Sequence, residues 1–139
     1  MPVTISVSAQ LRSDQRIEVE GQTNLPENAR LLVIVEREAS GVRWQSRTNV
    51  EQGAFSVGPL GPGSGMPDGN YRIIVQLSEA PVQPEQVQQR IGQQGQHLTG
   101  ELVTVSRHGL GQFASYSQRY LIGREPQGDR KEVRVLERP

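Results

Sequence analysis

The chain has 139 residues, which suits one domain with a single core, and it contains no cysteine, which excludes disulfides, cysteine-based metal sites and thiol nucleophiles. Its 15 basic and 15 acidic residues give a formal net charge of zero, so nothing in the overall charge attracts nucleic acid or an anionic membrane. No run approaches the roughly 20 apolar residues of a membrane span, and no membrane insertion is expected.

The first half of the chain alternates apolar and polar residues in short segments, which is typical of β-strands with one exposed face. We predict such strands at residues 3–9, 17–21, 42–50 and 55–57. The run at 31–35 reads LLVIV and predicts a central strand that is buried on both faces. Fifteen Gly and nine Pro separate the strands, and the Gly/Pro-rich segment 58–65 predicts an exposed loop.

The most informative stretch is 66–77, which reads MPDGNYRIIVQL. Pro67 presets φ for a turn, and Gly69 adopts positive φ at no steric cost. Tyr71 then opens a strand whose apolar residues recur at every second position. A Tyr that follows such a turn at the start of a strand is typical of a tyrosine corner, in which the hydroxyl binds a backbone group a few residues upstream. The pattern predicts an all-β, Greek-key immunoglobulin-like sandwich of seven to nine strands.

One short helix is predicted over 84–92, inside an insertion that spans 83–98. Pro84 suits the first helical position, and Val87 and Ile91 form one narrow apolar stripe. The remaining surface is polar and almost uncharged. It is interpreted either as a solvated cap or as an adaptable hydrogen-bonding surface for a partner, with candidate contacts at Gln86, Gln89 and Arg90.

The C-terminal part, 99–136, predicts a hairpin followed by an edge strand. The hairpin joins strands expected at 98–105 and 113–122, and the edge strand is expected at 132–135, where charges discourage edge-to-edge pairing. A break in regular structure is expected between them, at Pro126 and Gly128.

No motif in the sequence points to catalysis. His97 and His108 are the only histidines and lack metal-ligand spacing, so they are interpreted as surface-loop residues. There is no Gly-x-Ser-x-Gly elbow before a helix, no calcium loop, no phosphate-binding Gly loop and no assignable pair of acids. We therefore predict no catalytic, metal-binding or cofactor-binding residue, no cofactor, and a protein that is not an enzyme.

The aromatic and arginine content leaves room for a binding role. Trp44, the sole Trp, is a core anchor if it faces inward and a sugar-stacking platform or protein hot spot if it faces outward. Tyr116 and Tyr120 are further candidate stacking surfaces. Fourteen of the 15 basic residues are Arg, which suits planar hydrogen bonding to carboxylates or sugars, although GC-rich codon usage gives the same composition.

The order of these landmarks resembles a bacterial immunoglobulin-like or transthyretin-like β-sandwich module. The matching pieces are GQTNLP at 21–26, the run at 31–35, GAFS at 53–56, MPDGNY at 66–71, and a Gln-Pro helix start followed by spaced Val, Ile, Leu and Gly residues up to Gly100. Asn28 stands where a Gly is usual, a mild departure because Asn tolerates positive φ. The resemblance covers 21–100 and implies a non-catalytic spacer, docking surface or ligand binder, with no functional residue carried over.

We therefore expect residues 1–139 to form a single domain that serves as a non-catalytic structural or protein-interaction module of a bacterial envelope protein. A small-ligand or carbohydrate-binding module is the first alternative, and an accessory domain of an enzyme is the second. A protein partner is expected, with carbohydrate as the alternative and nucleic acid excluded. The location is periplasmic or envelope-associated if the chain is excised from a longer one, and cytoplasmic if it is complete.

Overall fold

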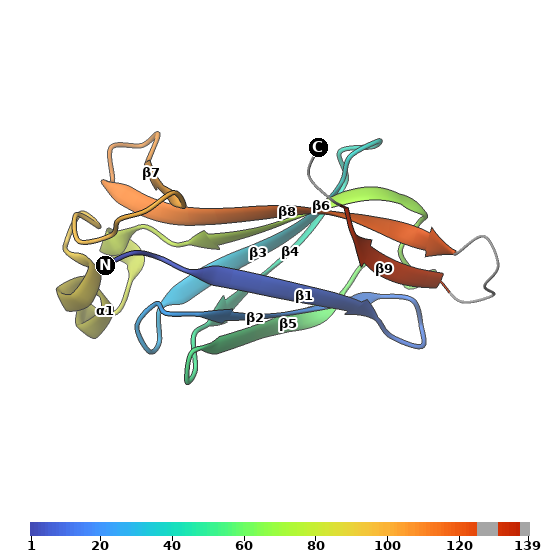
Figure 1. Cartoon of the computed structure of the whole chain (residues 1–139), viewed down its shortest axis with the longest axis horizontal. Helices are drawn as coiled ribbons and strands as arrows, with labels where there is room; N and C mark the ends of the chain where they lie inside the picture. The colour runs from blue at the N-terminus through green and yellow to red at the C-terminus, as the bar shows by residue number, and fades with distance from the viewer. Residues whose placement is uncertain (125–130, 137–139) are drawn as a thin grey trace.

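The computed structural model describes residues 1–124 and 131–136, and within them nine strands form two antiparallel sheets (Figure 1). The small sheet has the order β1-β2-β5, with β1 at Ile5–Leu11, β2 at Ile17–Thr23 and β5 at Ala54–Leu60. The large sheet has the order β4-β3-β6-β8-β7, and β9 also pairs with β8. Its strands are β3 (Arg30–Arg37), β4 (Arg43–Asn49), β6 (Gly69–Leu77), β7 (Val103–Val105), β8 (Gln112–Arg124) and β9 (Lys131–Val135). The prediction of a mostly β protein with one short helix is confirmed.

The core lies between the two sheets, because each strand turns alternate side chains inward. Val19 of β2, Val33 of β3 and Val75 of β6 are fully buried there. β3 lies between β4 and β6, and its outward-facing Ile34 is also buried. The prediction that LLVIV is a central strand is therefore confirmed, but its outer face is only partly buried, because Leu32 remains partly open to solvent.

The turn at residues 66–68, here called the corner turn, is fixed by three side chains that bind three consecutive carbonyl groups. The buried Tyr71 hydroxyl donates to the Pro67 carbonyl at 2.5 Å, which confirms the predicted tyrosine corner. Arg37 Nη2 of β3 donates to the Asp68 carbonyl at 2.7 Å. Lys131 Nζ of β9 donates to the Met66 carbonyl and lies 2.7 Å from Asp68 Oδ1. The corner turn therefore joins β3, β6 and β9.

The helical segment is fixed to β3 by one buried amide. The helix α1 (Glu85–Ile91) follows a 3₁₀ turn, η1 (Ala80–Val82), and buries Val87 and Ile91 as predicted. Gln83, between the two, accepts the Arg30 N–H at 2.8 Å and donates to the Arg30 and Ser78 carbonyls at 3.0 and 2.7 Å. Its side chain thus pairs with the backbone at the start of β3 as a neighbouring strand would.

Two predicted boundaries differ from the structure. The strand expected at 98–105 is reduced to β7, because Gly95 and Gly100 take positive φ, 67° and 106°, and Thr99 pairs instead with the N-terminal segment through Val3 N–H. The exposed loop expected at 58–65 begins later, because β5 continues to Leu60 along its neighbour β2. The last residue of the expected loop, Gly65, is buried. The break expected at Pro126 and Gly128 lies outside the described residues.

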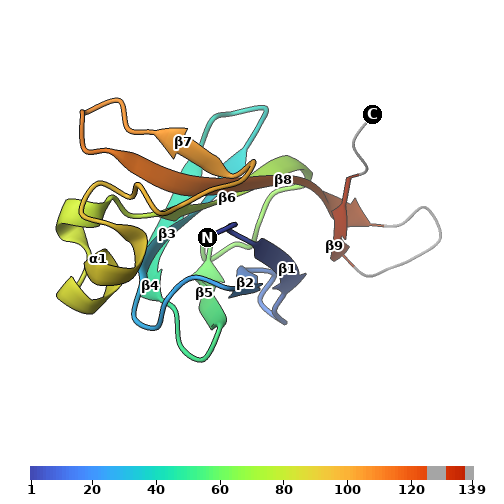
Figure 2. The same ribbon diagram turned by 60° about the vertical axis from the view of Figure 1, so that its left-hand side comes forward.

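Secondary elements cap the two ends of the sandwich (Figure 2). β7 pairs with the start of β8, at the end that carries α1, whereas β9 pairs with the last residues of β8 at the opposite end.

Asn28 has φ 67° and Gly69 has φ 145°, as the sequence predicted for both turns. No helix among the described residues has the length and apolar character of a membrane span.

Candidate functional site

The outward-facing residues of β3, β4, β6 and β8 form one continuous surface, here called the arginine face. Strand register places its charged residues in a row across all four strands, Arg43 beside Glu36, Glu36 beside Arg72, and Arg72 beside Arg119. Directly opposed residues in antiparallel strands lie about 4.5–5.5 Å apart at Cβ. The row on the outside of the large sheet therefore contains two neighbouring pairs of opposite charge, on either side of Glu36, and one pair of like charge, Arg72 and Arg119.

The middle of the arginine face is apolar. The next row places Ile34 beside Ile74, flanked by Gln45 and Ser117, and the row after it places Leu32 between Arg47 and Gln76. Ile34 is only 5% exposed, whereas Leu32 and Ile74 remain partly open to solvent. An apolar centre inside a polar rim is the usual anatomy of a protein interface.

The acidic residues of this face are already paired. Arg119 binds Glu38 through two hydrogen bonds, at 2.8 and 2.9 Å, which lower the pKa of the Glu38 carboxyl. Arg43 Nε lies 3.4 Å from Glu36. The Arg47 side chain forms no ion pair or hydrogen bond with any described residue. The face therefore keeps a surplus of cations.

A groove of about 730 Å³ continues the arginine face at the end that carries η1. Its lining includes Leu32, Arg47, Gln76, Val82 and Phe113, and Val82 is 49% exposed. The groove is thus partly apolar and bounded by a guanidinium group.

The groove also contains Glu79 and His108, beside the buried Ser106. The Ser106 hydroxyl donates to Glu79 Oε1 at 3.2 Å, and His108 reaches the hydroxyl through its backbone N–H, also at 3.2 Å. A serine nucleophile needs an imidazole nitrogen to take its proton. The hydrogen bonds of this cluster instead anchor the turn between β7 and β8.

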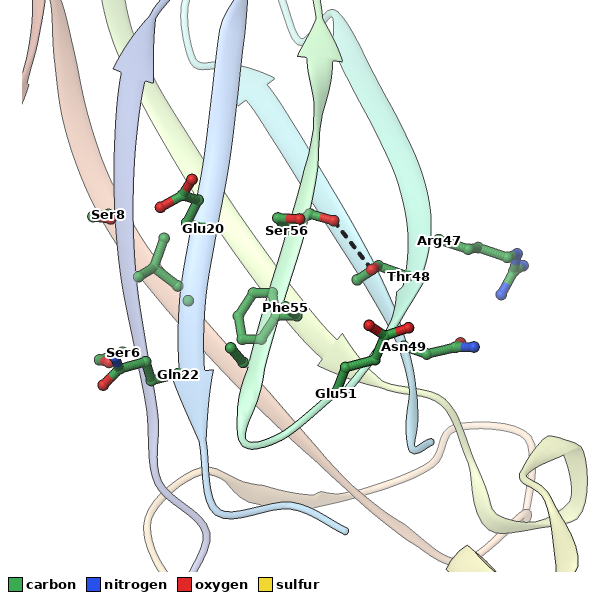
Figure 3. Close-up of a pocket in the computed structure, with 13 residues that line it drawn as sticks. Ser6, Ser8, Glu20, Gln22, Arg47, Thr48, Asn49, Glu51, Phe55 and Ser56 are labelled. Atoms are coloured by element: carbon green, nitrogen blue, oxygen red, sulfur yellow. Dashed lines mark hydrogen bonds between the residues drawn. The ribbon is translucent and has the colours of Figure 1, made fainter. Parts of the chain in front are cut away.

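The small sheet carries a second depression on its outer face, of about 780 Å³ (Figure 3). Two cross-strand rows form its floor: Ser8, Glu20 and Ser56 in one, and Ser6, Gln22 and Ala54 in the other. Short side chains on either side leave the Glu20 carboxylate open, and it has no ion pair in the described part of the chain. We call this depression the acidic trough.

Gly21 and Phe55 explain why the floor of the trough is closed. They are cross-strand partners, and the Phe55 ring lies over the glycine on the inner side of the sheet. A Cβ atom at Gly21 would meet Phe55 Cζ at 2.1 Å, so only glycine fits there. Phe55 is 5% exposed and offers almost no ring surface to the trough.

The structure divides the candidate residues named from sequence into two groups. Gln86, Gln89 and Arg90 are exposed together on α1. Trp44, Tyr116 and Tyr120 instead lie on the inner side of the large sheet, away from that helix.

The three aromatic side chains contact the core. The ring centroids of Trp44 and Tyr71 are 6.4 Å apart, and Tyr116 is partly buried against the core. Tyr120 is 1% exposed and donates to the Val7 carbonyl at 3.3 Å, and burial raises the pKa of its phenol to about 12. Trp44 therefore faces inward, which is the orientation expected of a core anchor.

Sequence reasoning did not single out Arg72, Arg119 or Glu20. The alternation of Arg43 and Arg47 with Trp44 was the one local signal for the arginine face.

No protein-family model, curated protein or solved structure matches this chain. Within residues 1–124 and 131–136, no group of three or more acidic or histidine side chains is placed to hold a metal ion.

Proposed function

We propose that this chain is a non-catalytic protein-interaction module with a Greek-key immunoglobulin-like topology, and that it binds its partner through the arginine face. The observation that carries the proposal is the apolar centre at Leu32, Ile34 and Ile74, bordered by Arg47 and by the charged row that contains Arg43, Arg72 and Arg119. Arg is enriched in protein interfaces and among the residues that dominate their binding energy.

The strand order supports the topological part of the proposal. In immunoglobulin-like sandwiches strands A, B, E and D form one sheet and strands C, F and G form the other, to which variable-type domains add strands C′ and C″. The orders β1-β2-β5 and β4-β3-β6-β8 fit A-B-E and C′-C-F-G, with β4 as C′ and no counterpart of strand D in the described part of the chain. The corner turn before β6 also fits, because the tyrosine corner precedes the corresponding strand.

The resemblance over residues 21–100 supports a place among bacterial envelope modules. A carbohydrate ligand is less favoured than a protein partner. Sugar binding commonly uses an exposed aromatic ring as a platform, and the rings of Trp44 and Tyr120 face the core. The acidic trough has hydroxyl and carboxylate groups, but its one ring, at Phe55, is nearly inaccessible among the described lining residues.

Site-specific photocrosslinking tests the proposal. A photoreactive phenylalanine analogue at Gln45, beside Ile34 on the arginine face, is expected to form protein adducts in the cells that make this chain. The same analogue at Glu101, an exposed position outside this face, serves as the matched control. Equal adducts at both positions, or none at Gln45, would contradict the proposal. A hydrolase activity abolished by substitution of His97 or His108 would contradict its non-catalytic part.

A further inference from the structure

The charges of this neutral chain are sorted between the two outer faces of the sandwich. The arginine face has a net charge of +3, from five arginines and two glutamates: Arg30, Arg43, Arg47, Arg72 and Arg119 against Glu36 and Glu38. The outer face of the small sheet carries Glu18 and Glu20 and no cation on its strands, a net charge of −2, and Arg47, counted with the arginine face, also lines the edge of the trough. Arg12, at the end of β1, lies 3.8 Å from Glu18.

Each face offers groups that lack a strong partner within the described residues. On the arginine face, the Arg72 side chain makes no hydrogen bond to a described residue, although it is near enough to Glu38 to help lower the pKa of that carboxyl. On the small sheet, the Glu20 carboxylate is flanked by Ser8 and Ser56. A guanidinium that enters the trough can bind the carboxylate bidentately while the serine hydroxyls accept its remaining N–H groups.

The shapes of the two faces are also complementary. Short side chains make the small sheet concave, with about 780 Å³ of space. The arginine face carries long side chains. Figure 3 shows the Arg47 side chain at the rim pointing away from the other residues that line the trough, so it leaves the Glu20 carboxylate accessible.

We propose that the chain associates with itself head to tail, with the arginine face of one copy docked on the acidic trough of the next. The inference rests on the proposed function, because it names a second copy as the partner of the arginine face. The two faces belong to different sheets (Figure 1), and they adjoin at β4, where Arg47, Thr48 and Asn49 line both the trough and the groove. A contact between unlike faces is heterologous, so it leaves one free face at each end and extends into open chains.

The association is expected to be weak and sensitive to salt. The trough spans only three strands, and contacts well below about 1,200 Å² of total buried area are typical of transient encounters. Its charges are exposed and therefore screened, with a Debye length near 10 Å at about 0.1 M salt. Electrostatic complementarity contributes orientation and specificity more than affinity.

Analytical ultracentrifugation of the chain tests this proposal directly. The average mass is expected to rise steadily with protein concentration from about 10 µM to about 1 mM in low salt, and to fall back to the monomer at about 0.5 M NaCl. Arg72→Glu and Glu20→Arg should each lower the association constant by at least about tenfold, since each removes one attraction and adds a repulsion. Circular dichroism and thermal melting confirm that both variants remain folded.

Mixing the two variants tests whether unlike faces meet. The R72E variant keeps an intact trough, and the E20R variant keeps an intact arginine face, so an equimolar mixture should associate although neither variant associates alone. Arg107→Glu and Glu101→Arg make the same charge changes at exposed positions outside both faces and should leave association unchanged.

A chain that stays monomeric at about 1 mM in low salt would overturn self-association. Association that survives both charge reversals would overturn it as well. If the monomeric chain still forms adducts with a different protein at Gln45, the proposed function stands and only the identity of the partner is wrong. If Gln45 forms no adducts with any protein, a second copy included, the arginine face is not a binding surface and the proposed function fails.

Discussion

The corner turn and the helical segment both tie a connection to the start or end of β3, but they use different chemistry. At the corner turn, a phenol, a guanidinium and an ammonium group each bind one carbonyl. At the helical segment, the neutral amide of Gln83 binds both backbone groups of Arg30. A neutral amide keeps its hydrogen bonds at any pH, whereas the Tyr71 phenol at the corner turn donates its hydrogen bond only while it is protonated. The two ends of one sandwich should therefore respond differently to pH and salt.

The largest effect is expected at Gln83, which is 5% exposed. Gln83→Ala leaves the Arg30 N–H and the Ser78 carbonyl without their partner, and it should lower the free energy of unfolding by about 2–4 kcal/mol. Urea denaturation measures this loss, which should be the same at acidic and alkaline pH. Gln86→Ala, at an exposed position nearby, should cost less than about 0.5 kcal/mol. Equal losses for the two variants would show that the buried amide does not fix the helical segment.

Tyr71→Phe should have the next largest effect. It removes a 2.5 Å hydrogen bond from a fully buried hydroxyl and should cost about 1–3 kcal/mol in denaturation experiments. Tyr116→Phe is the control, because the Tyr116 hydroxyl makes no hydrogen bond within the described residues. A loss near zero for Tyr71→Phe would mean that the corner turn is held by Arg37 and Lys131 alone.

Alkaline pH should weaken the sandwich through its buried phenols. Tyr120 pairs with Tyr71 across β6 and β8, and burial raises the pKa of both side chains, to about 12 for Tyr120. The raised pKa means that the folded state favours the neutral phenol. This contribution is complete below the ordinary value of about 10 and is lost as pH rises toward about 12.

Alkaline unfolding followed by absorbance near 295 nm and by circular dichroism tests that expectation. Tyr120→Phe should be less stable at neutral pH but should lose less stability between pH of about 10 and 12. An unchanged alkaline transition in this variant would contradict the assignment.

The smallest effect is expected for the Glu38–Arg119 pair, which links the end of β3 to β8 on the surface. Glu38→Gln should reduce stability only slightly, by less than Tyr71→Phe, and the difference should vanish in high salt. The lowered pKa of Glu38 means that its contribution is present above the ordinary carboxyl pKa and is lost as pH falls. Thermal melts of both proteins at neutral and acidic pH, with and without salt, measure this. A difference that persisted in high salt would contradict a surface electrostatic origin.

Local signals made the corner turn predictable from sequence. Pro67, Gly69 and Tyr71 lie within five residues, and each constrains the backbone or the core directly. Gln83 carried no such signal, because it is one of many glutamines in its segment. Its burial depends on Arg30, 53 residues away.

The two outer faces, like the burial of Gln83, could not be predicted from local sequence patterns. The alternation around Trp44 places Arg43 and Arg47 on one side of a strand. Arg72 and Arg119 become neighbours only through the pairing of β6 with β8. Glu20 becomes the centre of a trough only because register puts Ser8 and Ser56 beside it. Strand pairing over long separations decides which charges share a surface, and local sequence patterns do not show which strands pair.

Lys131 is the sole lysine of the chain, and its side chain is only 12% exposed because it lies against the corner turn. Acylation of its amine removes the charge that binds Asp68 and the proton donated to Met66. Acylation at Lys131, read by peptide mapping to separate it from acylation at the Met1 α-amine, should therefore be slow while β9 is paired and faster when that strand is released. The reactivity of Lys131 thus provides a measure of how often β9 separates from β8.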